Sequence, residues 1–246
     1  MALATDNGGN EGQVTERETL LRSVAEALKT PLMYIARQAE LGRTQEAVSL
    51  DSLRQMQTNA DAALRLVDSY LLGLDLAQQN LPLELEPVSL SSVLYDVAHD
   101  IEPLVRARGA RVELAIAGKY GQVMAHRPAL EAALACLSSE FAAMLDTIKQ
   151  DAALPQLTLA AHRSPKGIIA GLYAAGTSRP VALGAAAALK GVAAQPFAMA
   201  THSTGAGIFV AGELFAAMGT TLRDGRFRGQ HGLAVSLQQS TQMRLL

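Results

Sequence analysis

The sequence predicts an α+β chain in which an antiparallel helical hairpin precedes an α/β sandwich. Two long apolar patterns with helical spacing fill the first third of the chain, and a segment with two prolines, NLPLELEP, follows them. The remainder alternates strand-like and helical stretches. With 246 residues, of which 49% are hydrophobic, the chain is long enough to bury a sizeable core.

Charge and composition exclude several classes of protein. The 21 basic and 23 acidic residues nearly balance, so no overall field would gather nucleic acid or anionic lipid. No apolar run reaches about 18 residues, so we expect no membrane insertion. Residues 1–14 are polar and glycine-rich, lack the layout of a secretory signal and are expected to be a disordered tail. The lone Cys136 cannot form an internal disulfide, which favours a cytoplasmic protein.

The first helix is expected to begin near Thr15, since Glu18 three residues later completes a capping box. Pro31 removes a backbone donor and predicts a kink over 27–30. Gly42 marks the expected break. The apolar stripe of this helix comprises Leu21, Val24, Leu28, Leu32, Ile35 and Ala39.

The second helix is expected over 50–79. Its inner face is predicted to carry Leu53, Met56, Ala60, Ala63, Val67, Tyr70, Leu71 and Leu74. A hairpin of two helices buries its stripe on one side only, so we expect a homodimer that forms a four-helix bundle. The alternative is a hairpin that packs on the rest of the same chain. The hairpin domain is placed at 15–80 and the α/β domain at 81–246.

The α/β domain is expected to follow a definite order of elements. These are a short strand at 83–86, a helix at 90–107, the strands RVELAIA and QVMAH, a helix from near Pro128 to about 148, the strand pair LTLAAH and KGIIAGLY, small helices within the alanine-rich 181–218, and a final hairpin, TTLRDGRFRGQHGLAVSLQ, with DG and RG at turns.

Six stretches, in this order, resemble the core of a bacterial sensor histidine kinase. They are AEALKTPL at the H-box, LELEPVSLSSVLYDVAHDIEPLVRARGARVEL at the entry to the ATP-binding domain, LEAALACLSSEFAAML at the N-box helix, AQPF at the F-box, STGAGI at the second glycine box and GLAVSL at the final strand. The resemblance covers 15–239. It implies a dimerisation and phosphotransfer hairpin followed by an ATPase-type α/β sandwich, a mixed sheet under three helices.

The H-box departs from the family pattern at its reactive residue. Glu26 stands at the phospho-acceptor histidine, and Ala27 stands at the adjacent acidic position. A carboxylate is a poor phosphate acceptor without activation, so histidine autophosphorylation is not expected here. The five histidines all lie outside the hairpin and are expected to be ordinary surface or strand-end residues: His99, His126, His162, His202 and His231.

The nucleotide-binding positions implied by the resemblance are also altered. Cys136 and Glu140 stand at the two asparagines of the N-box. Cys136 is expected to pack, and Glu140 to be a solvated helix residue, with a role as cation ligand as the alternative. In the first glycine box Gly176 is kept, but Ala174 replaces the aspartate that reads adenine, a loss of about 2–4 kcal/mol.

The second glycine box keeps Gly205 and Gly207. We expect them to permit a tight turn into a helix, with a phosphate cradle as the alternative. No cofactor and no metal are expected.

The resemblance implies that a response-regulator receiver domain docks on the exposed face around the H-box. The candidate docking residues are Glu26, Lys29, Thr30, Met33, Tyr34 and Arg37, whose alternative role is a solvated helix face. The sequence thus predicts an inactive kinase-like dimer that regulates phosphorelay signalling by binding a receiver domain or a partner kinase. Two alternatives stay open: a divergent phosphotransferase or phosphatase that uses the Thr30 hydroxyl, and a small-molecule sensor that uses the glycines of the altered pocket.

Overall fold

The computed structural model describes residues 28, 32–33, 35–42, 49–79, 83–119, 121–145, 155–165, 167–175 and 206–240. The described residues of the first predicted helix, which include 35–42, are helical. The capping box at Thr15, the kink at Pro31 and most of the alanine-rich stretch lie outside the described residues.

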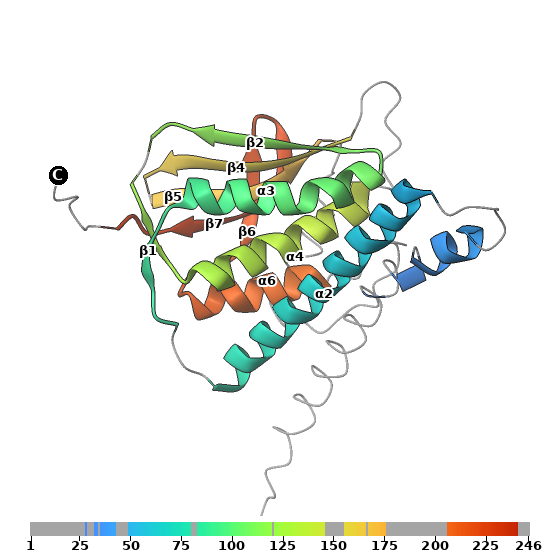
Figure 1. Cartoon of the computed structure of the whole chain (residues 1–246). Coiled ribbons are helices and arrows are strands. Elements are labelled where there is room, and N and C mark those ends of the chain that lie inside the picture. Colours follow the sequence, from blue (N-terminus) through green and yellow to red (C-terminus); the bar gives the residue numbers. More distant parts are fainter. Residues whose placement is uncertain are drawn as a thin grey trace, which may run out of the picture.

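The elements follow one another in the predicted order (Figure 1). They are α2 (Leu50–Gln79), β1 (Glu86–Val88), α3 (Leu90–Ala107), β2 (Arg111–Ala117), β3 (Val123–Ala125), α4 (Arg127–Leu145), β4 (Gln156–Ser164), β5 (Gly167–Ala174), α6 (Ala206–Ala217), β6 (Arg223–Phe227) and β7 (Gln230–Leu237).

The main sheet has five strands in the order β2-β4-β5-β7-β6. Strands β2 and β4 are parallel and the other neighbours are antiparallel, so the sheet is mixed. Helices α3, α4 and α6 lie on one face of it (Figure 1). Strands β1 and β3 pair separately. This arrangement confirms the predicted α/β sandwich.

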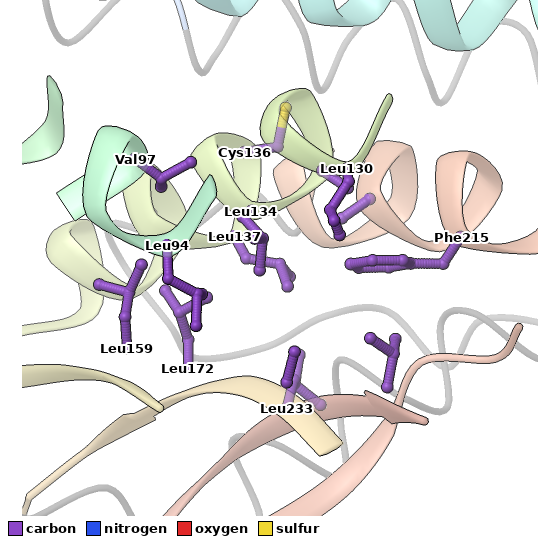
Figure 2. Close-up of a cluster of buried hydrophobic side chains, with 14 of the residues drawn as sticks. Leu94, Val97, Leu130, Leu134, Cys136, Leu137, Leu159, Leu172, Phe215 and Leu233 are labelled. Atoms are coloured by element: carbon purple, nitrogen blue, oxygen red, sulfur yellow. The ribbon is translucent and has the colours of Figure 1, made fainter. Parts of the chain in front are cut away.

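The core lies between the sheet and these three helices. Alternate strand residues face the helices, as expected for a sheet with one face covered. Figure 2 shows Leu159, Leu172 and Leu233 of the strands opposite Leu94, Leu137 and Phe215 of the helices. All six side chains are fully buried. Each contributes about 1.5–3 kcal/mol of transfer free energy, so this layer fixes the positions of α4 and α6.

Helix α3 begins and ends with recognisable caps. The Ser89 side chain accepts a hydrogen bond from the backbone N–H of Ser92. At the other end Gly109 adopts a φ of 68°, and the N–H of Ala110 donates to the carbonyl of Val105. This left-handed glycine stops the helix and turns the chain into β2.

Two local predictions were wrong. The first strand is Glu86–Val88 rather than 83–86, because it pairs with β3 from Glu86 onward. The DG pair, Asp224 and Gly225, lies inside β6 and makes no turn. The turn of the final hairpin is Arg228–Gly229, where φ is 48° and 81°. Positive φ at both central residues suits the right-handed twist of a two-residue hairpin.

Helix α2 packs on α4 and α6, on the side away from the sheet (Figure 1). Ala63 and Tyr70 are buried in this contact, and an ion pair of 2.7 Å joins Arg65 to Asp100 of α3. Leu53 and Leu71, predicted on the inner face of the hairpin, are instead 49% and 54% exposed in the single chain. The described part of the hairpin therefore packs on the same chain, which was the alternative arrangement, and the homodimer stays a prediction.

Candidate functional site

The altered nucleotide-site residues meet where α4 lies against the first turn of α6. Glu140 of α4 is only 6% exposed, and its Oε1 accepts a hydrogen bond of 2.9 Å from the backbone N–H of Gly207. The prediction of a solvated Glu140 is therefore wrong. Its carboxyl group satisfies one of the N–H groups that the first turn of a helix leaves without a partner, and its negative charge suits the positive end of the helix dipole.

Gly207 is needed because the two helices approach closely. A Cβ at this position would lie 2.6 Å from the backbone oxygen of Cys136 and 2.6 Å from Cγ of Glu140. Gly207 is the second residue of α6, and its φ is not positive. Its predicted role in a turn before the helix is thus replaced by a role in helix packing.

Cys136 lies on the side of α4 away from the sheet (Figure 2). The pKa of its thiol is raised to about 12, mainly by burial and also by the charge of Glu140, while a hydrogen bond with Ser69 of α2 acts in the opposite direction. The thiol is therefore protonated at neutral pH and is a poor nucleophile. Its burial agrees with the expectation that Cys136 packs rather than reacts.

Tyr70 of α2 completes this junction, and its position beside the altered site was not predicted from the sequence. It is 2% exposed, and burial raises its pKa, with further contributions from Cys136 and Glu140. Within the part of the chain that the structure describes, its hydroxyl has no hydrogen-bond partner. The helical spacing of Ala63, Tyr70 and Gly73 indicates one face of α2, but only the packing shows that α4 and α6 cover it.

Ala174 ends β5 and is fully buried in the core cluster. Its methyl group offers no acceptor to an amine. Gly176 and Gly205 lie outside the described residues.

On the hairpin, Met33 is 62% exposed and Arg37 is also exposed. The other candidate docking residues, Glu26, Lys29, Thr30 and Tyr34, lie outside the described residues. The structure thus brings together Cys136, Glu140 and Gly207. The docking of a receiver domain on the hairpin stays a prediction.

One histidine has a clear structural role. His126 Nδ1 accepts the backbone N–H of Ala129, so this residue caps α4. Within the described ranges, no three His, Cys, Asp or Glu side chains cluster in a way that would hold a metal ion. None of the helices in the described part of the chain combines the length and hydropathy that crossing a bilayer requires.

No protein-family model and no curated protein sequence matches the chain. Several solved structures do. The histidine kinase AdeS of Acinetobacter baumannii is 16% identical, with 87% of this chain and 98% of that chain covered and a TM-score of 0.49. Full-length ShkA, solved in complex with AMPPNP, is 18% identical, and the match covers 91% of this chain and 46% of ShkA, with a TM-score of 0.53. A bacterial phosphotransferase is 10% identical, and the match covers 96% of this chain and 100% of the phosphotransferase, with a TM-score of 0.52.

These identities establish likeness of fold alone. In its fold, the chain therefore has a histidine-kinase-like core that includes an α/β sandwich.

Proposed function

We propose that this protein is a catalytically inactive, histidine-kinase-like regulator that binds a receiver domain or a partner kinase. One observation carries the proposal. Cys136 and Glu140, which occupy the two N-box asparagine positions, are both buried at the α2–α4–α6 junction. Oε1 of Glu140 is already bonded to the N–H of Gly207.

Electrostatics support the loss of nucleotide binding. A carboxylate at Glu140 adds negative charge where the family holds a magnesium triphosphate with neutral amides, and among the described residues no acidic cluster surrounds it to hold the metal. The methyl group of Ala174 leaves the adenine amine without an acceptor. Because the lost acceptor is a charged carboxylate, this unmade hydrogen bond costs about 2–4 kcal/mol, which is roughly a hundredfold or more in affinity.

The hairpin supports a role in binding. Glu26 stands where phosphotransfer requires a histidine, and a scaffold without that histidine still presents a helical surface. Met33 and Arg37 are exposed on this surface, so both are available to a partner. A large apolar side chain next to a cation is a common composition of protein interfaces.

The proposed homodimer rests on exposed leucines of α2. Leu50, Leu64 and Leu71 are 73%, 62% and 54% exposed. They are spaced by 14 and 7 residues and therefore share one stripe with the repeat of a coiled coil. Leu64→Glu with Leu71→Glu is expected to convert a dimer to a monomer in light scattering. Tyr95→Glu, at a site on α3 that is 66% exposed, serves as the control and is expected to leave the mass unchanged.

The proposed function is tested by affinity capture with the full chain as bait and purified receiver domains and histidine kinases of the source organism as prey. The expected result is saturable binding of at least one receiver or kinase, weakened by Arg37→Glu and Met33→Ala. Arg163→Glu, an exposed position on β4, is the matched control. Absence of binding to every receiver and kinase, or equal weakening by Arg163→Glu, would contradict the proposal.

A further inference from the structure

Strand β2 forms one edge of the main sheet, and among the described strands it has a neighbour on one side only (Figure 1). The N–H of Arg111 donates to the carbonyl of Pro155, and β2 then pairs with β4 in parallel. Successive residues of a strand turn their backbone groups to opposite sides. The N–H and C=O groups of Val112, Leu114 and Ile116 therefore point to the open side, which we call the β2 edge.

The side chains of the same three residues are apolar and face the helices. Val112, Leu114 and Ile116 pack against the core cluster, yet each of them is only partly buried. Ala115, by contrast, faces the other side of the sheet, where it joins the small cluster around Tyr173. A strand added at the β2 edge would therefore continue both the hydrogen-bond ladder and the apolar layer of the core.

Helix α3 presents an exposed aromatic residue beside this edge. Asp96 and Asp100 lie on one flank of α3, where they form ion pairs of 2.7 Å with α4 and α2. With about 3.6 residues per turn, Tyr95 and Ala98 lie on the opposite flank. That flank faces away from α4 and toward β2, which also contacts α3 (Figure 1). Tyr95 is 66% exposed, so its ring is available to a segment bound along β2.

The other edge of the sheet, β6, is protected against pairing with a further strand. It has five residues, of which Arg223, Asp224 and Arg226 are charged and Gly225 has no side chain. Short, charged edge strands discourage pairing with another chain. Strand β2 has seven residues, and its last four, LAIA, include no charge, glycine or proline. Of the two edges, β2 is therefore the one suited to accept a strand.

The ends of β2 are basic. Arg111, at one end, donates to Oε1 of Gln156 at 2.7 and 3.1 Å, and this neutral amide leaves the positive charge uncompensated. Lys119, just beyond the other end, is exposed and forms no ion pair with the described residues. Glu113, between them, pairs with Arg228 at 3.7 Å. The charges at the two ends complement acidic groups at both ends of a bound segment.

We propose that the β2 edge binds an extended, antiparallel segment of a partner protein that has apolar residues at alternate positions and an acidic residue at each end. Residues opposite Val112, Leu114 and Ile116 turn their side chains toward the helices and extend the apolar layer beside Tyr95. The backbone ladder supplies affinity, and the alternate side chains supply specificity. The site uses none of the residues proposed to bind a receiver domain or to form the homodimer, so it goes beyond that function.

The test is amide NMR of the isotope-labelled full chain with the capped peptide Asp-Val-Thr-Val-Thr-Val-Asp. In the free chain, the N–H groups of Val112, Leu114 and Ile116 are expected to exchange rapidly with D2O, while β4 protects those of Glu113 and Ala115. Peptide at saturation, reached at about millimolar concentration, is expected to slow exchange at the three edge-facing amides by about tenfold or more. Absence of this alternation, or of saturable protection at these amides, would overturn the proposal.

Matched peptides and variants locate the contact. N-methylation of the central valine, whose N–H faces β2, is expected to weaken binding about tenfold or more, whereas N-methylation of a threonine, whose N–H faces away, is tolerated. A peptide with lysine at both ends is expected to bind about tenfold less tightly. Arg111→Gln with Lys119→Gln removes this preference, and Arg223→Gln with Arg226→Gln, on the β6 edge, leaves it intact.

Three outcomes would contradict the assignment, whatever the result of receiver binding. They are an equal or reversed effect of the two N-methylations, equal affinity for the peptides that end in aspartate and in lysine, and an equal loss of preference in the β6 variant.

Discussion

Gly207→Ala tests whether α6 is held against α4 as closely as the structure shows. The new Cβ would lie 2.6 Å from the backbone oxygen of Cys136, and ordinary contacts begin at about 3.4 Å, so the first turn of α6 must move by about 0.8 Å. Overpacking of this kind costs about 1–3 kcal/mol. The same movement weakens the Glu140 hydrogen bond, worth about 1.5–3 kcal/mol with a charged acceptor. The higher helix propensity of alanine returns about 1 kcal/mol.

The expected net loss is therefore about 2–5 kcal/mol in the free energy of unfolding, measured by urea denaturation with far-ultraviolet circular dichroism. Gly73→Ala is the matched control, because its Cβ would lie 3.3 Å from Cγ1 of Val210, a side chain that can shift. We expect that variant to differ from the parent by less than about 1 kcal/mol. A Gly207→Ala protein as stable as the parent would refute the close helix contact.

Four further predictions concern single side chains. Glu140→Ala leaves the N–H of Gly207 without an acceptor and is expected to lower the unfolding free energy by about 1–3 kcal/mol, with Glu140→Gln in between, in the same urea assay. Tyr70→Phe removes a buried hydroxyl that has no hydrogen-bond partner among the described residues, so the melting temperature of this variant is expected to equal or exceed that of the parent. A clear decrease would mean that the hydroxyl is bonded. Because the pKa of Cys136 is raised from 9.0 to about 12, its thiol should resist iodoacetamide at pH 8 until urea unfolds the chain, and rapid labelling of the native protein would contradict this. The free energy of unfolding should fall as the pH rises from about 9 toward 12, because in this range only the unfolded thiol ionises. Burial lowers the pKa of His162, so its imidazole should titrate below pH 6.5 when followed by NMR. The stability that the neutral imidazole contributes above pH 6.5 should be lost as the pH falls through the pKa of the folded state, and His162→Gln should abolish this pH dependence.

Periodicity in the sequence was enough to find most of the secondary structure. The second helix and the helix at 90–107 were placed to the residue, because apolar side chains recur on one face and breaking residues follow. The final turn was misplaced in part, since DG and RG are equally good turn signals. The turn lies at Arg228–Gly229 because Phe227 pairs with Gln230, and the register of strand pairing cannot be predicted from the local sequence.

Three residues of the predicted site lie together in the structure, but the sequence did not predict what surrounds them. The order of the motifs brought Cys136, Glu140 and Gly207 into one group, and the structure places them in contact. Whether Glu140 faces water depends on what packs over α4, and that is decided by α2 and α6, far away in the sequence. The burial of Tyr70 could not be predicted for the same reason, because it depends on the packing of α2 against α4 and α6. The division at 80–81 and the homodimer stay predictions.

Isothermal titration calorimetry of the full chain with ATP and Mg²⁺ tests the central claim most directly, with incubation in γ-phosphate-labelled ATP as its companion. The structure's buried Glu140 and methyl-bearing Ala174 lead us to expect no saturable heat up to millimolar nucleotide and no label on the protein. Saturable magnesium-dependent binding in the micromolar range, or stable incorporation of the labelled phosphate, would contradict the account.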